Sequence, residues 1–303
     1  MISEKNILNT FKHLINKSDA EGIVVVGSGD DAAVLDTKEK NLVHSVDISK
    51  IDTHFPKNFP AEDVAYRSIA IALSDLAAMG AFPSFITIGL TSNSKSIKWY
   101  EDFTKGIEKS LDDFQIKLVG GDVTYGELSI CANVFGFLYN KPLQRSGARI
   151  GDKIYLTGKL GEGRQGLKDF NNNINSKYCK KFKKPEPQFI KSKFISSYAS
   201  SCIDISDGLI KDLSSICSMS DVGAKIFYED IPIHKDIEDL SHGDDFELCF
   251  TASKEHSSKF KKNGYFCIGE ILDGDKLTLI RDNNVIELDS DGLDILRISN
   301  YQK

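Results

Sequence analysis

The sequence lacks the features of a membrane, secreted or nucleic-acid-binding protein. No segment approaches the eighteen or so consecutive apolar residues that cross a bilayer, and the first nineteen residues carry charges throughout instead of the apolar centre of a signal peptide. Basic residues are fewer than acidic ones, 38 against 44, and the one basic run, residues 180–184, is short. With a net charge of -6, the chain is expected to bind neither nucleic acid nor membrane and to work in the cytoplasm.

Cysteine motifs are missing as well. The six cysteines are scattered with no C-x-x-C pair, and most of them lie in apolar runs. We therefore expect buried, reduced thiols rather than disulfides or a zinc site.

The motifs of the common ATP-binding folds are also absent. The sequence has neither G-x-x-x-x-G-K-[ST] nor the kinase words H-R-D and D-F-G. A glycine loop at residues 27–32, GSGDDA, fits G-x-G-x-x-A, but a strand-like stretch follows it instead of the helix that a dinucleotide fold needs. Its aspartates, Asp30 and Asp31, would each repel a phosphate oxygen about 4 Å away by about 4 kcal/mol at an effective dielectric constant of about 20. The loop therefore suits a cation, and phosphate would reach it only through that cation.

The sequence does contain an alternation of helix-like and strand-like segments. Helical periodicity is predicted for residues 3–17, 61–79 and 97–111. Strand-like runs are predicted at residues 23–26, 32–35, 42–47, 86–90, 116–122 and 128–138, and a second series begins at 153–158. This alternation predicts an α/β (α+β) fold with mixed sheets. A polar stretch near Lys141, rich in glycine and proline, predicts the boundary between two domains, residues 1–141 and 142–303.

A polar tract at residues 171–187 has little apolar content. It is predicted to be a mobile loop or lid, and the plainer alternative is a solvated surface insertion.

Acidic residues gather at the ends of apolar runs and between glycines. Taken singly, each of them is explained by turn or helix-cap chemistry. Asp75 is more informative, because it lies inside the otherwise apolar segment 69–81, where an unpaired carboxylate would be costly. Carboxylates and serines without a cluster of histidine or cysteine are hard oxygen ligands, and they favour Mg²⁺ or Mn²⁺ over zinc. The acids considered together are Asp30, Asp31, Asp47, Asp75, Asp122, Asp204, Asp207, Asp244 and Asp245.

Seven motifs, in this order and approximate spacing, resemble those of the thiamine-monophosphate kinase family: GSGDDAAVL, LSDLAAMGA, GGDVTYG, QRSGARIGD, LTGKLGEGRQGL, IDISDGLIKDL and HGDDFELCF. The wider superfamily includes aminoimidazole ribonucleotide synthetase. The resemblance implies a two-domain aminoimidazole ribonucleotide synthetase-like fold that forms a homodimer through the sheets of its first domain. It also implies transfer of the γ-phosphoryl group of ATP to thiamine monophosphate.

The resemblance also assigns roles to particular positions. It implies that several Mg²⁺ ions are bound by Asp30, Ser45, Asp47, Asp75, Asp122, Asp204 and Asp207. Nucleotide contacts are implied for Gly121, Arg145 and Ser206, and contacts with the thiamine substrate for His54 and Asp244. Between the neighbouring aspartates of the first motif we expect Asp30 to be the ligand and Asp31 to be a turn or supporting acid.

Some positions depart from the family pattern and concern mainly the thiamine pocket. Val46 stands where the family usually has threonine, Asp244 where it has glutamate, Tyr125 where it has arginine, and Leu296 where it often has an aromatic residue. These departures keep open the alternative of a non-catalytic regulatory protein that binds Mg²⁺ and nucleotide. Within the superfamily, a ligase like aminoimidazole ribonucleotide synthetase is the nearest enzymatic alternative.

The implied reaction needs little from a side-chain base. Its acceptor is a phosphate whose second ionisation lies near pH 6, so it is largely a dianion at neutral pH. We therefore expect direct in-line transfer assisted by Mg²⁺, with no covalent phosphoenzyme.

Overall fold

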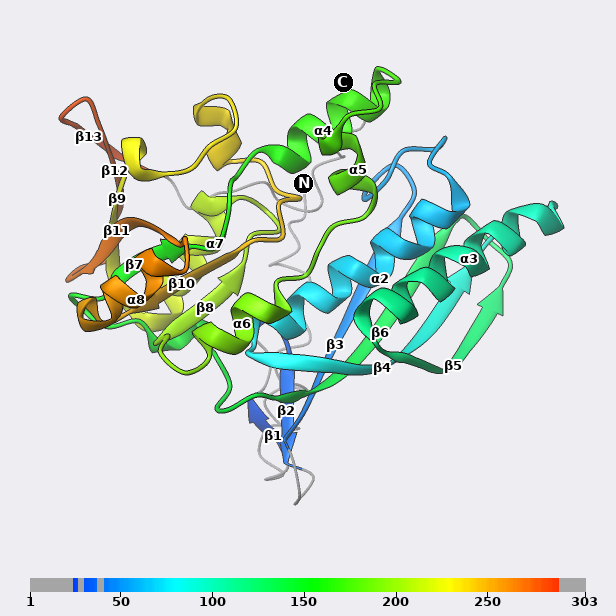
Figure 1. Cartoon of the computed structure of the whole chain (residues 1–303), viewed down its shortest axis with the longest axis horizontal. Helices are drawn as coiled ribbons and strands as arrows, with labels where there is room; N and C mark the ends of the chain where they lie inside the picture. Colours follow the sequence, from blue (N-terminus) through cyan, green and yellow to red (C-terminus); the bar gives the residue numbers. More distant parts are fainter. Residues whose placement is uncertain (1–23, 27–29, 37–40, 289–303) are drawn as a thin grey trace.

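The computed structural model describes residues 24–26, 30–36 and 41–288. The helix predicted at residues 3–17 and the position Leu296 lie outside the described residues. Two sheets with helices packed on them make up the described part, which confirms the predicted mixed α/β class (Figure 1). Among the described helices, none combines the length and apolar character needed to cross a membrane.

The first sheet has six strands in the order β1-β2-β3-β6-β4-β5. All neighbours are antiparallel except β4 and β5, which are parallel. The strands are β1 (Val24–Val26), β2 (Ala33–Asp36), β3 (Asn41–Lys50), β4 (Ala81–Thr91), β5 (Lys117–Thr124) and β6 (Ser129–Leu138). The helices packed on it are α2 (Ala61–Ala78) and α3 (Ile97–Phe114).

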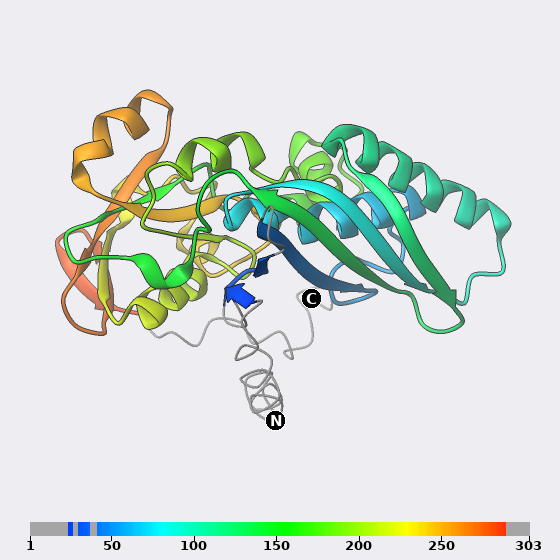
Figure 2. The same ribbon diagram turned by 90° about the horizontal axis from the view of Figure 1, so that it is seen from below.

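Among the described residues, helices cover the first sheet on one face only. Side chains along β3 and β6 alternate between buried and more exposed positions, as expected for strands with one covered face. The buried set, including Val43, Ile130 and Val134, packs in one core with Leu73 and Leu76 of α2. Figure 2 shows α2 and α3 on one side of this sheet, with no described helix on the other.

The second sheet has seven strands in the order β13-β12-β9-β11-β7-β10-β8. These are β7 (Lys153–Leu156), β8 (Ser201–Asp204), β9 (Gly223–Phe227), β10 (Leu248–Ala252), β11 (Phe266–Leu272), β12 (Leu277–Arg281) and β13 (Asn284–Glu287). Both faces of its centre are covered, because Ile154 and Leu156 join the core beside α7 (Leu209–Ser220) while Tyr155 joins the core beside α8 (Ser257–Lys262). Burial on both faces explains the unbroken apolar runs of β8 and β10.

Helix α2 lies between the two halves of the molecule. It contacts β3, β4, β6 and α3 on one side and β8 of the second sheet on another, and almost all of its residues are buried. A helix buried on all sides must satisfy every polar side chain it carries, here including Arg67, Ser74 and Asp75.

The prediction of a loop at residues 171–187 is wrong. The segment contains α5 (Lys177–Lys183), which packs against α4 (Glu162–Asn171) and leads to α6 (Phe189–Ile195). Ser176 caps α5 by accepting a hydrogen bond from the Cys179 N–H, and Phe182 is buried in the core of the first sheet. A single buried aromatic side chain anchors a helix whose other residues are mostly polar.

The chain passes from the first sheet to the second through residues 139–152, which include a short 3₁₀ helix at Arg145–Gly147. This crossing coincides with the polar stretch from which the domain boundary was predicted. Because α4 and α5 return to pack on the first core, the limits 1–141 and 142–303 remain a proposal.

All six cysteines are free thiols, and Cys179, Cys202, Cys217 and Cys249 are buried, as the sequence predicted, whereas Cys267 is exposed.

Candidate functional site

Three carboxylates from distant segments meet at the junction of the two sheets. Asp31 follows β1, Asp75 lies on the last turns of α2, and Asp204 ends β8. One oxygen atom from each of the three lies within 4.8 Å of the others. Two of these acids, Asp75 and Asp204, are among the metal ligands predicted from the motifs. We call this group the acidic cluster.

Serine hydroxyls and one arginine are the partners of the acidic cluster. The Ser45 hydroxyl donates to Asp75 Oδ2 at 2.5 Å, and the Ser74 hydroxyl donates to Asp204 Oδ2 at 2.6 Å. Arg145 holds Asp31 in a bidentate pair, at 2.8 Å from Nη2 and 3.2 Å from Nε. Ser45 and Arg145, both predicted for the site, are therefore brought to the cluster.

The charge of the acidic cluster is not balanced by its partners. Burial, followed by repulsion from Asp204 and Asp31, raises the pKa of Asp75 well above its usual range. Burial and the nearby Asp31 raise the pKa of Asp204 in the same way. One guanidinium faces three carboxylates, so the site requires protons or a cation to be stable.

Asp30 lies beside the acidic cluster rather than within it. Its Oδ1 accepts a hydrogen bond from the Arg145 backbone N–H at 2.7 Å, and burial raises the pKa of its carboxyl group. Asp31 is the neighbour whose carboxylate reaches Asp75 and Asp204. The structure therefore favours Asp31 for the cluster, whereas the motif comparison favoured Asp30.

A second group of polar residues forms around His54 and Asp244, the two positions predicted to contact the thiamine substrate. The guanidinium of Arg67 donates to the His54 carbonyl oxygen at 3.1 Å and to Asp244 Oδ1 at 2.5 Å. Burial lowers the pKa of His54, and its Nδ1 accepts a hydrogen bond from the Lys50 N–H. Burial raises the pKa of Asp47, which interacts electrostatically with both His54 and Asp75. Asp47 thus connects this second group with the acidic cluster.

The turn after β8 presents Ser206 and Asp207. Asp212, on the first turn of α7, accepts hydrogen bonds from the backbone N–H groups of both residues at 3.1 Å. Asp207 forms an ion pair with Lys211 at 2.5 Å. The exposed Ser206 and half-buried Asp207 are thereby held at the surface of the junction, near Asp47.

Gly121 and Asp122 lie on the edge strand β5, apart from the acidic cluster. A side chain at Gly121 would meet the Ile88 carbonyl oxygen at 2.5 Å, so the strand pairing requires glycine there. In the strand pairing, Asp122 is opposite Gly89 on β4, Gly89 is opposite Cys131 on β6, and Cys131 is opposite Ile48 on β3. Paired residues lie on the same face of a sheet, and Ile48 lies on the uncovered face. Ser45 contacts α2 from the covered face, so the pairing register puts Asp122 on the opposite face of the sheet.

Sequence reasoning missed Arg67 and Asp212, and it included Asp245 among the acids without giving it a role. Arg67 gave no signal because an arginine on a helix is usually solvated, and Asp212 looked like an ordinary first-turn acid. Asp245 is buried, accepts hydrogen bonds from the N–H groups of Gly161 and Gly163, and thereby caps α4. Burial raises the pKa of Asp245 to about 7. Its position in the Asp-Asp pair of the HGDDFELCF motif was the signal that could have identified it.

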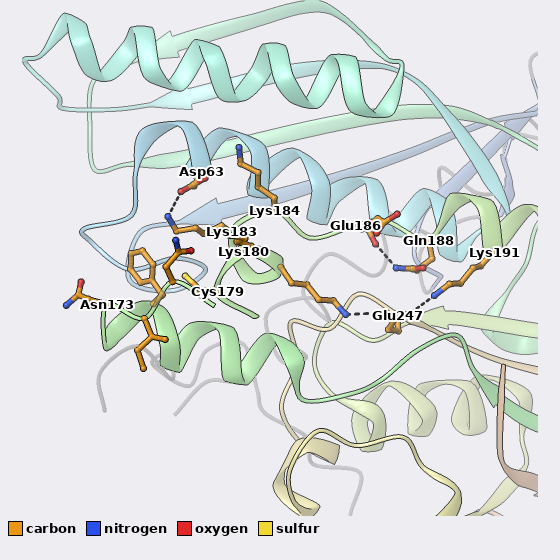
Figure 3. A pocket seen from close by; sticks show the side chains of 14 residues that line it. Asp63, Asn173, Cys179, Lys180, Lys183, Lys184, Glu186, Gln188, Lys191 and Glu247 are labelled. Atoms are coloured by element: carbon orange, nitrogen blue, oxygen red, sulfur yellow. Dashed lines mark hydrogen bonds and ion pairs between the residues drawn. The ribbon is translucent and has the colours of Figure 1, made fainter. Parts of the chain in front are cut away.

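A cavity of about 970 Å³ lies beside α5, and none of the predicted site residues is among those that line it. Figure 3 shows Lys183 directed at Asp63, and lysines on both sides of Glu247. Lys181 and Lys191 pair with Glu247 at 3.4 and 3.1 Å. These ion pairs fasten α5 and the segment after it to α2 and β10.

Comparisons with known proteins place these observations in a family context. The model of "AIR synthase related protein, N-terminal domain" matches residues 29–138. A thiamine-monophosphate kinase of Buchnera aphidicola subsp. Schizaphis graminum is 38% identical over 94% of this chain and 96% of its own.

Solved structures share the fold. The crystal structure of a thiamine-monophosphate kinase from Stenotrophomonas maltophilia covers 91% of this chain and 96% of its own with 29% identity and a TM-score of 0.75. A structure described as AaThiL complexed with AMPPCP and TMP matches with a TM-score of 0.82 and 24% identity, over 95% of this chain and 96% of its own. These matches confirm the predicted aminoimidazole ribonucleotide synthetase-like fold.

Proposed function

Because this chain belongs to the thiamine-monophosphate kinase family, as its motifs predicted, we propose that it transfers the γ-phosphoryl group of ATP to thiamine monophosphate and forms thiamine diphosphate. The observation that carries this proposal is the match along almost the whole of both chains, 94% and 96%, at 38% identity. The free cysteines favour a reducing compartment, and the cytoplasm is the expected place of this activity.

The acidic cluster fits a hard divalent cation such as Mg²⁺. Its three carboxylates are close together, and burial and mutual repulsion raise the pKa values of Asp75 and Asp204, so the protein alone does not stabilise their charged forms. We propose Asp31, Asp75 and Asp204 as the residues that hold the ion, with Ser45 beside them. The motif match adds Asp30, Asp47, Asp122 and Asp207 as ligands of further ions. Bound Mg²⁺ neutralises phosphate oxygens of both substrates and so lets two anions approach each other.

The protein itself acts by positioning its substrates. Arg145, which is paired with Asp31, and Ser206, whose turn is held by Asp212, are proposed to contact the nucleotide together with Gly121. His54 and Asp244 are proposed to contact thiamine monophosphate. Because the acceptor phosphate is already a dianion, His54 need not remove a proton, and the transfer is proposed to be direct and in line.

The uncovered face of the first sheet is the proposed homodimer interface. Val46 and Ile48 are 53% and 56% exposed on β3, and His44 stacks on Phe135 beside them. An apolar face of this kind is unusual on a monomer. Asp122 lies on the same face at the β5 edge of the sheet, whereas Asp31 of the acidic cluster lies at the opposite edge, between β1 and β2. We propose that the dimer sets the β5 edge of the partner subunit beside β1 and β2, and so brings Asp122 of the partner subunit toward the acidic cluster.

The test is to incubate the purified protein with MgATP and thiamine monophosphate and to follow thiamine diphosphate by chromatography. The wild type should form it, whereas Asp75→Asn should not, although it should keep the wild-type circular dichroism spectrum. Asp102→Asn is the matched control, because Asp102 is an acid on the neighbouring helix α3 whose ion pairs in the described part of the chain are with the surface residues Lys98 and Lys105. Binding of MgATP without product would refute the kinase and favour a non-catalytic nucleotide-binding protein.

A further inference from the structure

Arg67 is a buried cation that joins three segments of the chain at one point. Its side chain is only 2% exposed. Its Nε donates to the His54 carbonyl oxygen at 3.1 Å, its Nη1 to the Phe182 carbonyl oxygen at 2.7 Å, and its Nη2 to Asp244 Oδ1 at 2.5 Å. The loop before α2, helix α5 and the loop before β10 therefore meet on one guanidinium.

The surroundings of Arg67 leave its guanidinium little freedom. Its guanidinium carbon lies 4.2 Å from the centre of the Phe182 ring and 5.9 Å from that of Phe246. Helix α5, which carries Phe182, is fastened to α2 by the ion pairs of Lys183 with Asp63 and of Lys184 with Glu62. A planar fork held by rings and carbonyl groups in this way can fix the orientation of a carboxylate, which a lysine could not do as well.

Asp244 has an uncommon backbone conformation, and its N–H donates a hydrogen bond to the Ser206 carbonyl oxygen at 3.0 Å. Its φ is +70°, a left-handed value that is uncommon for residues other than glycine. One carboxylate oxygen is bound by Arg67, while Oδ2 has no hydrogen-bond partner among the described residues, and the side chain is 29% exposed. The arrangement leaves one edge of the carboxylate available to a ligand while the other edge is fixed.

We infer that Arg67 is the positioning residue of the acceptor site. Resting on the proposed kinase function, this assigns Arg67 the task of holding Asp244 and the His54 loop in place for a substrate that carries a cationic ring, which the exposed edge of Asp244 would face. Arg67 also lies eight residues before Asp75 on α2, a rise of about 12 Å. One rigid helix thus sets the distance between the acidic cluster and the group that orients the acceptor.

The experiment compares Arg67→Lys, Asp244→Asn and the double variant in steady-state kinetics with each substrate varied in turn. Arg67→Lys keeps the charge but loses the fork, so the KM for thiamine monophosphate should rise at least tenfold, while the KM for ATP stays within about twofold. Asp244→Asn should have a similar effect, and the double variant should be little worse than either single one, because the two residues act as a pair.

Controls separate positioning from folding and from failure of the proposed function. Arg164→Lys changes another arginine with three acidic partners, Asp236, Glu238 and Asp239, and should leave both KM values unchanged. Equal changes in both KM values, or additive effects in the double variant, would overturn the inference. A wild-type protein that forms no thiamine diphosphate would instead refute the kinase proposal, and should Arg67→Lys fail to fold, Asp244→Asn alone must still raise the acceptor KM selectively.

Discussion

Asp30 and Asp31 are adjacent in the chain but have different surroundings. Asp31 belongs to the acidic cluster and is paired with Arg145, whereas Asp30 accepts a hydrogen bond from the Arg145 backbone. We expect Asp31→Asn to weaken Mg²⁺ binding at least tenfold and to reduce turnover accordingly, because it removes one of three converging charges. Asp30→Asn should have the smaller effect. The measurement is the thermal midpoint of each variant as a function of Mg²⁺ concentration, together with the rate at saturating Mg²⁺.

Asp102→Asn serves as the control for loss of a surface carboxylate in this comparison. If the thermal midpoint of Asp30→Asn no longer responded to Mg²⁺ while that of Asp31→Asn still did, Asp30 would be the ligand, as the motifs predicted.

The choice between Asp30 and Asp31 could not be made from the sequence alone, although other site residues could be predicted from it. Asp75 was predicted as a site residue because a carboxylate in an apolar segment needs a partner, and the structure places it in the acidic cluster. The choice between Asp30 and Asp31 depends on where Arg145 lies, more than a hundred residues away. Arg67 could not be found for a similar reason, since its partners come from segments that only the fold brings together.

Helix α4 depends on a buried cap whose charge should make stability depend on pH. Burial raises the pKa of Asp245 to about 7, above its value of about 3.8 in the unfolded chain. The protonated form is therefore favoured in the folded state, and stability is lost as the pH rises from about 4 to 7. Relative to Asp245→Asn, the wild type should lose up to about 3 kcal/mol between pH 5 and pH 8. Urea unfolding of both proteins at the two pH values measures this difference.

Asp236→Asn is the control with the opposite sign. The pKa of Asp236 is lowered by its hydrogen bond with Arg164, so the advantage of the wild type over this variant should be present at pH 7 and should disappear on acidification below about 4. A difference between wild type and Asp245→Asn that does not vary with pH would show that Asp245 stays uncharged, or stays charged, across the whole range.

Helix α5 shows why the polar composition of residues 171–187 led to the wrong prediction of a loop. The segment is mostly polar, yet its one buried ring, Phe182, is 1% exposed and packs on Phe59 and under Arg67. We expect Phe182→Ala to lower the free energy of unfolding by about 3 to 5 kcal/mol, because it leaves a cavity in the first core. Ile190→Ala, at a position 88% exposed, should change it by less than about 0.5 kcal/mol. If both variants were equally stable, the segment would behave as the mobile loop that its composition predicted.

In the molecule as a whole, the burial patterns of the strands could be predicted from the sequence, whereas the packing of helices onto the sheets and the pairing register could not. Strands β8 and β10 have unbroken apolar runs because both faces of their sheet are covered. Strands β3 and β6 alternate between buried and more exposed residues because the described helices cover one face of their sheet. The return of α4 and α5 onto the first core has no local signal, because it depends on contacts with Phe59 and α2. The pairing register, which alone puts Asp122 on the uncovered face, is likewise a property of the complete sheet.

The register leads to a test of how two chains would share a site. If Asp122 acts on the acidic cluster of the partner subunit, Asp75→Asn and Asp122→Asn should each be inactive alone. After mixing and subunit exchange, one site of every mixed dimer contains neither substitution, so an equal mixture should recover about a quarter of the wild-type rate. Adding Ile48→Asp to both variants should abolish the recovery, because a charge on the exposed apolar face opposes association, whereas Val285→Asp on the second sheet should not. Light scattering checks the oligomeric state of each protein. No recovery from a mixture that demonstrably exchanges subunits would mean that each chain supplies both acids to its own site.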